Sequence, residues 1–273
     1  MRWSERQLAM LREMGIRIWP TGQPSPVRAQ PARPAAGTSQ SVSVAGHARL
    51  EAPTGPACVE PVQEQPSARI VESGQRPVGV QSMGWNALRE TAGACTACKL
   101  CEGRKQVVFG TGSTQAQWLI VGEAPGEQED LQGEPFVGKS GQLLDAMLRS
   151  IGLTRGEAPP QHQVYIANTI KCRPPGNRNP QPEELAQCEP FLIRQLELLQ
   201  PCIILAMGRF AVQSLLRSDE PVGRLRGRVH RYQGVPLIVT YHPAYLLRNP
   251  EDKARAWDDL CLAVETAQPA LPR

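Results

Sequence analysis

Four apolar runs of strand length alternate with segments of helical period through the second half of this 273-residue chain. Each run is short enough for a strand, and most end at Gly or a polar residue that begins a loop. Strands that alternate with helices form a mainly parallel sheet with helices on both faces. The pattern therefore predicts an α/β domain over residues 85–267. The runs are 117–124, 164–172, 202–208 and 235–247, and the expected helices are 140–153, 181–201, 209–216 and 251–267.

The first 84 residues differ in composition from the rest of the chain. Residues 20–84 are rich in Pro, Gln, Ser, Ala and Gly and contain no Phe, Tyr or Trp. Such a segment cannot bury enough apolar surface to offset its ordering entropy, so a disordered linker is predicted.

Residues 1–19 have a different pattern, with Ser4 as a helix cap and apolar residues near helical spacing. This pattern predicts a short amphipathic helix that docks on a partner. Gln7 to Leu11, "QLAML", resembles the peptides with which bacterial repair proteins bind the sliding clamp. The alternative is a helix that packs on its own domain.

Composition excludes several classes of protein. No apolar run approaches the roughly 20 residues that span a bilayer, and the charged N-terminus lacks the apolar segment of a secretory signal. We therefore expect a cytoplasmic protein, and a monomer. The net charge of +4 is compatible with nucleic-acid binding without requiring it. In a reducing cytosol, clustered members of the eight cysteines favour metal binding over disulfides.

The cysteines form two separated pairs. Cys95 and Cys98 are a C-x2-C pair, and Cys172 and Cys188 flank the proline-rich turn "RPPGNRNPQP". Four thiolates can hold zinc or an iron–sulfur cluster, and spacing alone does not decide between them. A redox C-x2-C pair and a buried core thiol at Cys188 are the alternatives, and Cys101 is a third cysteine beside the first pair.

Polar residues follow three of the expected strands. Glu123, Asn168 and His242 stand at or just after the strand ends, and parallel sheets bind ligands beyond the carboxyl ends of their strands. Phe136 lies between glycines in a polar loop, where it could stack on a base or merely plug the sheet edge. The loop "GEAPGEQED" lacks the Lys-Ser/Thr ending of a phosphate-binding loop. These positions predict a site at this edge.

Two basic residues could contact phosphate. Lys139 begins a predicted helix, whose N-terminus favours anions, and Arg248 follows the last strand. With other basic stretches they could line a track for a nucleic-acid backbone, although most such residues are solvated surface.

Several motifs together resemble one family over residues 90–265. They are "GEAPGEQED", "GEPFVGKSGQLL", "YIANTIKCRPPGNRNPQPEE" with a later Cys, and "HPAYLLR", which resemble the family 4, iron–sulfur uracil-DNA glycosylases. The resemblance implies a three-layer α/β/α fold around a four-stranded parallel sheet. It also implies a [4Fe–4S] cluster on Cys95, Cys98, Cys172 and Cys188, with Cys101 at a variable position.

The resemblance also implies roles for residues around the base. Asn168 would donate to uracil O4 and accept from N3–H, Phe136 would stack on the base, and Glu129 would lie near C5, where it hinders the methyl group of thymine. Gly122 and Ala124 belong to the same substrate-binding segment.

The implied reaction is hydrolysis of the N-glycosidic bond of a deoxyuridine flipped out of DNA, which starts base-excision repair. His242 would hydrogen-bond uracil O2, and Glu123 would stabilise the sugar cation and orient water. Leu246 would be the wedge that fills the gap in the base stack, and Lys139 and Arg248 would contact the DNA. The alternatives are a non-catalytic iron–sulfur DNA-binding module of a repair or polymerase assembly, and a zinc protein that hydrolyses another nucleoside-like substrate.

Overall fold

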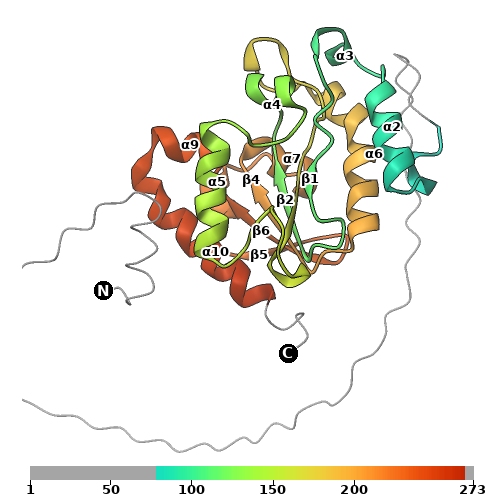
Figure 1. Ribbon diagram of the computed structural model, residues 1–273. Coiled ribbons are helices and arrows are strands. Elements are labelled where there is room, and N and C mark those ends of the chain that lie inside the picture. Colours follow the sequence, from blue (N-terminus) through green and yellow to red (C-terminus); the bar gives the residue numbers. More distant parts are fainter. Residues whose placement is uncertain (1–77, 268–273) are drawn as a thin grey trace, which may run out of the picture. The chain divides into compact units, whose positions relative to one another are not determined.

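The computed structural model describes residues 78–267 (Figure 1). The predictions for the docking helix at 1–19, its clamp partner and the linker up to residue 77 concern residues outside this range. We expected the linker to extend to residue 84, but the structure places the start of the domain before that residue. Residues Val80–Ser82 form the short helix η1, and the Val80 side chain is buried against Leu88 and Phe191. Met83 packs against the same cluster, and its carbonyl accepts a hydrogen bond from Arg194 at 2.7 Å, so this stretch belongs to the domain.

The sheet has six strands in the order β1-β3-β2-β4-β6-β5. Its four central strands are parallel and coincide with the four apolar runs of the sequence. They are β2 (Trp118–Gly122), β3 (Val164–Asn168), β4 (Ile203–Met207) and β6 (Val235–Thr240).

The expectation of a four-stranded sheet was too small. Two antiparallel strands, β1 (Thr111–Gly112) and β5 (Val229–Tyr232), border the parallel core. β5 reads Val-His-Arg-Tyr and is half exposed, so its sequence gives no buried-strand signal. β1 has only two residues. A search for apolar runs therefore does not predict either edge strand.

Helices cover both faces of the sheet, as a three-layer α/β/α fold requires (Figure 1). Alternate side chains of β2 point to opposite faces, with Ile120 in one apolar cluster and Leu119 and Val121 in the other. The first face packs against α5 (Lys139–Ser150), α9 (Pro243–Arg248) and α10 (Lys253–Ala267), and the second against α6 (Pro182–Leu199) and α7 (Arg209–Leu216).

Short elements fill the connections. In the described residues they are α2 (Trp85–Ala94), α3 (Leu100–Gly103), α4 (Glu127–Gln132), α8 (Val222–Leu225), η2 (Pro160–His162), η3 (Pro175–Asn177) and η4 (Pro250–Asp252). No helix within residues 78–267 is long and apolar enough to cross a membrane.

The strand order indicates where a ligand would bind at the carboxyl ends of the strands. Strands β2 and β4 are neighbours. The chain leaves β2 toward α5 on one face and leaves β4 toward α7 on the other. This divergence opens a crevice at the carboxyl ends of the two strands, which is where doubly wound sheets bind ligands.

Candidate active site and cysteine cluster

A cavity of about 750 Å³ lies at this crevice. Residues at the carboxyl ends of three of the parallel strands line it: Glu123 after β2, Asn168 at the end of β3 and His242 after β6. Other predicted residues that line the cavity are Ala124, Glu129, Phe136 and Arg248.

Asn168 is the most distinctive polar group in this cavity. Its side chain is 2% exposed, and its Oδ1 atom is buried without a hydrogen-bond partner in the described part of the chain. Buried acceptors are nearly always satisfied, so an orphan acceptor on a residue that lines a cavity points to a ligand that donates a hydrogen bond.

Gly122 allows Asn168 and Phe136 to approach the end of β2. A Cβ atom at this position would lie 2.4 Å from Asn168 Oδ1 and 2.6 Å from the Phe136 ring. Both distances are shorter than van der Waals contact. Gly122 is therefore required by its packing against Asn168 and Phe136.

Phe136 has an unusual backbone conformation. Its φ angle is 56°, in the left-handed region that a bulky residue rarely adopts. Its ring stacks on the His242 ring, with centroids 5.3 Å apart. The strained backbone thus aims an aromatic face at the cavity, and this placement matches the predicted stacking role without testing it.

Glu129 holds the Phe136 loop. Its carboxylate accepts hydrogen bonds from the backbone N–H groups of Gly126, Val137 and Gly138, at 3.1, 3.0 and 3.2 Å. The side chain is 8% exposed. Glu129 therefore ties the start of α4, at Gly126, to the segment that follows Phe136. Its effect on the methyl group of thymine stays a prediction.

His242 is held in one protonation state and one tautomer. It caps α9, where its Nδ1 atom accepts a hydrogen bond from the Ala244 N–H at 3.1 Å. Burial, with a smaller contribution from Arg248, lowers the pKa of His242 to about 4. At neutral pH the ring is thus uncharged, and because Nδ1 is the acceptor, the proton sits on Nε2 as a donor.

Glu123 is a half-buried carboxylate at the N-terminus of α7. Its Oε1 atom accepts the Phe210 N–H at 3.0 Å. Burial raises the pKa of Glu123 above its ordinary value, and the α7 N–H groups together with Arg209 and Arg248 partly offset this rise. The carboxylate therefore ionises less readily than a surface Glu but has fixed donors that support its charged form.

Gly208 was not singled out from the sequence. It has φ of 90°, and a Cβ atom there would lie 2.4 Å from Glu123 Oε1. The signal for it is "AMGRF", a glycine directly between an apolar run and a helix. Gly208 lets the carboxylate reach the first turn of α7.

Leu246 does not fit its predicted role. Its side chain is fully buried in the core between the sheet and α5, so it cannot enter a DNA stack from this position. The neighbouring Leu247 is 46% exposed. The prediction of Leu246 as the wedge is corrected, because the face of α9 that carries this residue packs against the core.

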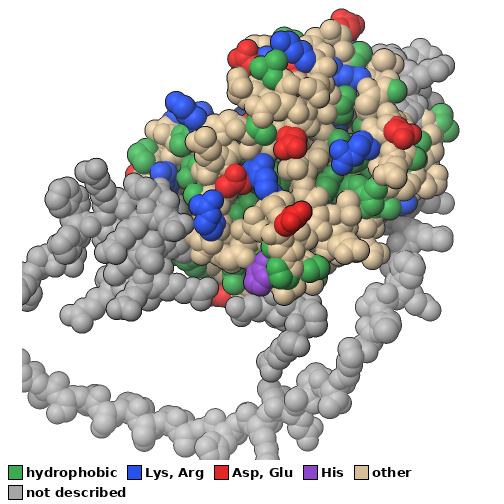
Figure 2. Space-filling model, viewed as in Figure 1, with side chains coloured by type: hydrophobic (Ala, Val, Ile, Leu, Met, Phe, Trp, Pro, Cys, Tyr) green, Lys and Arg blue, Asp and Glu red, His purple; other side chains and the backbone are tan. Residues whose placement is uncertain are grey.

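The basic residues divide between cavity and surface. Arg248 lines the cavity, whereas Lys139 does not. Figure 2 shows Lys and Arg interspersed with Asp and Glu on the face it presents, without one continuous basic patch. A DNA-contacting role for Lys139 stays a prediction.

All four predicted cluster ligands line a second, small and apolar cavity, and so does Cys101. The C-x2-C pair follows α2, Cys172 follows β3 and Cys188 lies in α6. Arg104 donates to Cys172 Sγ and the Lys171 N–H donates to Cys188 Sγ, both at 3.2 Å. Segments distant in the chain thus bring the thiols to one place.

The donor set is four thiols around one cavity, and four thiolates are the ligand chemistry of an iron–sulfur cluster. Within residues 78–267, no three or more His, Cys, Asp or Glu side chains are grouped so that they could hold one metal ion. A zinc ion needs ligands at about 2.0–2.3 Å, whereas a four-iron cluster places its own iron and sulfide between the thiolates. Burial raises the pKa of Cys188 to about 12. A Cys188 thiolate would therefore need positive charge beside it, which a bound metal centre would supply.

Comparison with known proteins agrees with this site. The model of the uracil DNA glycosylase superfamily matches residues 109–261. The chain is 43% identical over 166 residues to the type-4 uracil-DNA glycosylase of Archaeoglobus fulgidus, covering 58% of this chain and 80% of that protein. The corresponding values are 42% over 163 residues, 59% and 82% for the Thermotoga maritima enzyme. For the Pyrobaculum aerophilum enzyme they are 40% over 190 residues, 66% and 93%.

The superfamily match spans the four parallel strands, the residues that line the large cavity, and Cys172 and Cys188. Together with the relatives, it confirms the resemblance seen in the sequence motifs. The chain belongs to the type-4 branch of the uracil-DNA glycosylase superfamily.

Proposed function

We propose that this protein hydrolyses the N-glycosidic bond of deoxyuridine in DNA, which releases uracil and leaves an abasic site. The observation that carries this proposal is the orphan Asn168 Oδ1 atom in the cavity. Uracil in a duplex is inaccessible, so the nucleotide must be flipped out of the stack to reach it.

Recognition follows from the chemistry of the Asn168 amide. Its oxygen accepts from uracil N3–H and its NH₂ group donates to uracil O4. Cytosine presents a bare N3 and an amino group at the same positions, so acceptor would meet acceptor and donor would meet donor. A rigid site with such unpaired groups discriminates strongly between the two bases.

The bond from C1′ to uracil N1 breaks while water forms a new bond to C1′. Negative charge develops on the departing base, and the His242 Nε2–H group donates to O2, where that charge builds. Positive charge develops on the sugar, and the Glu123 carboxylate stabilises it and takes a proton from the attacking water. Phe136 stacks on the base, and Glu129 keeps that loop in place.

The cysteine cavity supports a [4Fe–4S] cluster on Cys95, Cys98, Cys172 and Cys188. The cluster would supply a structural clamp between the start of the domain, the end of β3 and α6, and the hydrolysis involves no electron transfer. Iron and sulfide analysis with visible spectra of Cys188→Ser beside Cys101→Ser tests the ligand set. We expect only the first to lose iron. Loss of iron in Cys101→Ser alone would reassign the ligand.

The decisive experiment measures abasic product from a duplex with a single uracil. We expect wild-type protein to cleave it and to leave the matching cytosine duplex intact. Asn168→Ala should lower the rate by about 10²–10³-fold, as for removal of one oxyanion donor. The matched control is Asn86→Ala, an exposed Asn in α2, with unchanged rate.

Folded, iron-loaded wild-type protein that leaves uracil in DNA would overturn the proposal. Binding to DNA without cleavage would instead support the non-catalytic DNA-binding alternative.

A further inference from the structure

Lys171 is a buried lysine that the proposed chemistry does not use. It follows β3 by three residues and is only 2% exposed. Burying an ammonium group costs several kcal/mol unless hydrogen bonds compensate. An apolar residue of similar length could fill the same volume at lower cost, so the amine indicates a specific task.

The Lys171 amine makes two short hydrogen bonds. Its Nζ donates to the backbone carbonyl of Asn168 at 2.8 Å and to the side-chain oxygen of Gln195 at 2.7 Å. Gln195 lies in α6 and is fully buried. The amine therefore joins the residue that faces uracil to the helix that covers the sheet.

Gln195 is itself held on its other side. Its Nε2 group donates to the Phe109 carbonyl at 2.9 Å and to the Tyr165 hydroxyl at 3.2 Å. The acceptor oxygen of this amide is thus turned toward Lys171. The Gln195 amide therefore has one defined orientation, with its Nε2 group toward Phe109 and Tyr165 and its oxygen toward Lys171.

The backbone of Lys171 is fixed as well. Its carbonyl accepts the Val108 N–H at 2.8 Å, and its own N–H donates to Cys188 Sγ at 3.2 Å. The amine reaches back to Asn168 from an anchored position beside the cysteine cavity.

We propose that Lys171 is a positioning residue that fixes the Asn168 peptide and thereby aims the Asn168 amide at uracil. The inference rests on the proposed function. Its physical basis is that the peptide between Asn168 and Thr169, at the end of β3, is held on both sides. Its N–H donates to the Gly122 carbonyl at 3.0 Å, and its carbonyl accepts the Lys171 amine at 2.8 Å. A carbonyl held by an ammonium group sets the peptide plane on which the side chain is mounted.

Lys171→Met tests this inference, because methionine keeps the length of the side chain and removes the donor. We expect a loss of about 100-fold in single-turnover excision of uracil, the size that a small misplacement of a reacting group produces. Inhibition by free uracil should weaken, while affinity for abasic duplex stays unchanged. Lys171→Arg, which retains donors, should recover part of the rate.

Tyr165→Phe is the matched control, since it removes one hydrogen bond at the far end of the same network. Gln195 Nε2 keeps its shorter bond to the Phe109 carbonyl, so its oxygen still faces Lys171. It should excise uracil at the wild-type rate. Gln195→Met provides a second variant if Lys171→Met does not fold. It removes the other acceptor of the amine, and a loss of rate without loss of abasic-DNA affinity is expected. Rates are compared per mole of iron-loaded protein.

An active wild type with a Lys171→Met variant of unchanged rate would refute the inference and leave the proposed function intact. Equal losses of uracil affinity and abasic-DNA affinity would also refute it, because they indicate general damage. An inactive wild type refutes the proposed function itself, and with it the recognition role that Lys171 is said to support.

Discussion

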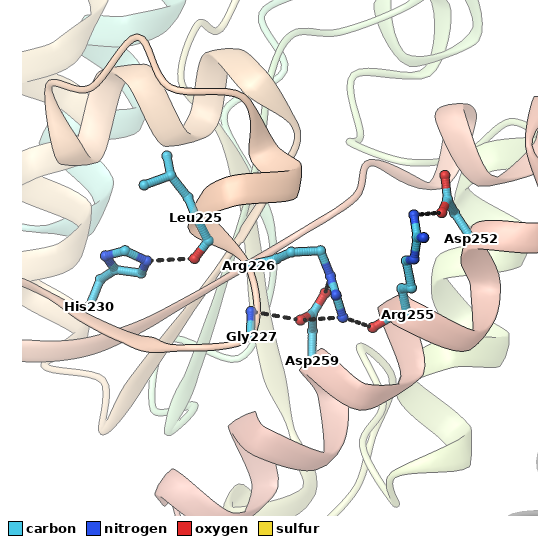
Figure 3. A network of polar contacts seen from close by, with 7 residues as sticks. All are labelled: Leu225, Arg226, Gly227, His230, Asp252, Arg255 and Asp259. Carbon is cyan, nitrogen blue, oxygen red and sulfur yellow. Dashed lines mark hydrogen bonds and ion pairs between the residues drawn. The ribbon is translucent and has the colours of Figure 1, made fainter.

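Two polar clusters of the domain differ in whether their buried polar atoms have hydrogen-bond partners. In the first, the cavity, Asn168 Oδ1 has no partner and His242 keeps one ring N–H free of the capping bond. In the second, Figure 3 shows a network in which the polar groups bond one another. Its residues are Leu225, Arg226, Gly227, His230, Asp252, Arg255 and Asp259.

Asp259 is the centre of the satisfied network. It is fully buried, and its two oxygens accept from Arg226 Nε at 3.0 Å and from the Gly227 N–H at 3.1 Å. The Arg226 guanidinium also lies over the ring of Tyr241, which lines the cavity. The cluster whose polar atoms bond one another thus packs against a residue that lines the cavity. Hydrogen-bonded buried groups are typical of a structural role, whereas a buried group without a partner needs a separate explanation.

Breaking the satisfied cluster should give the largest effect on stability. We expect Arg226→Met to lower the free energy of unfolding by about 3–5 kcal/mol, because it leaves the buried Asp259 carboxylate without a positively charged partner. Urea denaturation measures this, with Arg228→Met, an exposed arginine of the same segment, as control. Arg226→Met combined with Asp259→Leu should recover most of the loss. No recovery would show that the pair does more than neutralise a charge.

Changing the cavity should act on rate instead. We expect Glu123→Gln to slow uracil excision by about 100-fold, within the usual range for a positioned acid–base group. Its stability at neutral pH should be equal or higher. The sign follows from the raised pKa: the folded state binds the Glu123 proton more tightly than the unfolded state, so stability falls as pH rises from 4.5 through the raised value. A loss of stability in Glu123→Gln would contradict this distinction.

The pH profile of excision tests the same carboxylate in the wild type. Activity needs ionised Glu123 and neutral His242, so the rate should rise with pH along one limb and then stay level. The midpoint should lie above the ordinary Glu value of 4.5, since burial raises the pKa of Glu123, while His242 titrates at about 4. Arg209→Met should move the midpoint to higher pH, because Arg209 favours the carboxylate. An unmoved midpoint would assign the limb to another group.

Features that depend on neighbouring residues could be predicted from this sequence, whereas features that depend on contacts between distant residues could not. The parallel strands and the residues at their ends, such as Asn168, follow from local apolar runs and one topological rule. Gly208 and Arg226 were missed because their importance lies in contacts with Glu123 and Asp259, which are distant in sequence. β5 was missed because its alternating, half-exposed residues resemble a basic surface stretch.

Leu246 and Leu247 show the limit of a motif most clearly. Successive helical residues point about 100° apart, so the start of α9 at Pro243 decides which leucine faces the core. The motif "HPAYLLR" gives both leucines and no helical phase. Only the packing of α9 against α5 distinguishes them.

The two leucines therefore provide the smallest and most selective test of the comparison between buried and exposed groups. Leu247→Ala should slow excision from duplex DNA on the order of tenfold, since flipping a base costs a few kcal/mol of unstacking. It should leave excision from single-stranded DNA and stability unchanged. Leu246→Ala should instead destabilise the domain by about 2–5 kcal/mol, as for other buried leucines. Duplex-specific slowing in Leu246→Ala at unchanged stability would return the wedge to Leu246, and would mean that α9 rotates when DNA binds.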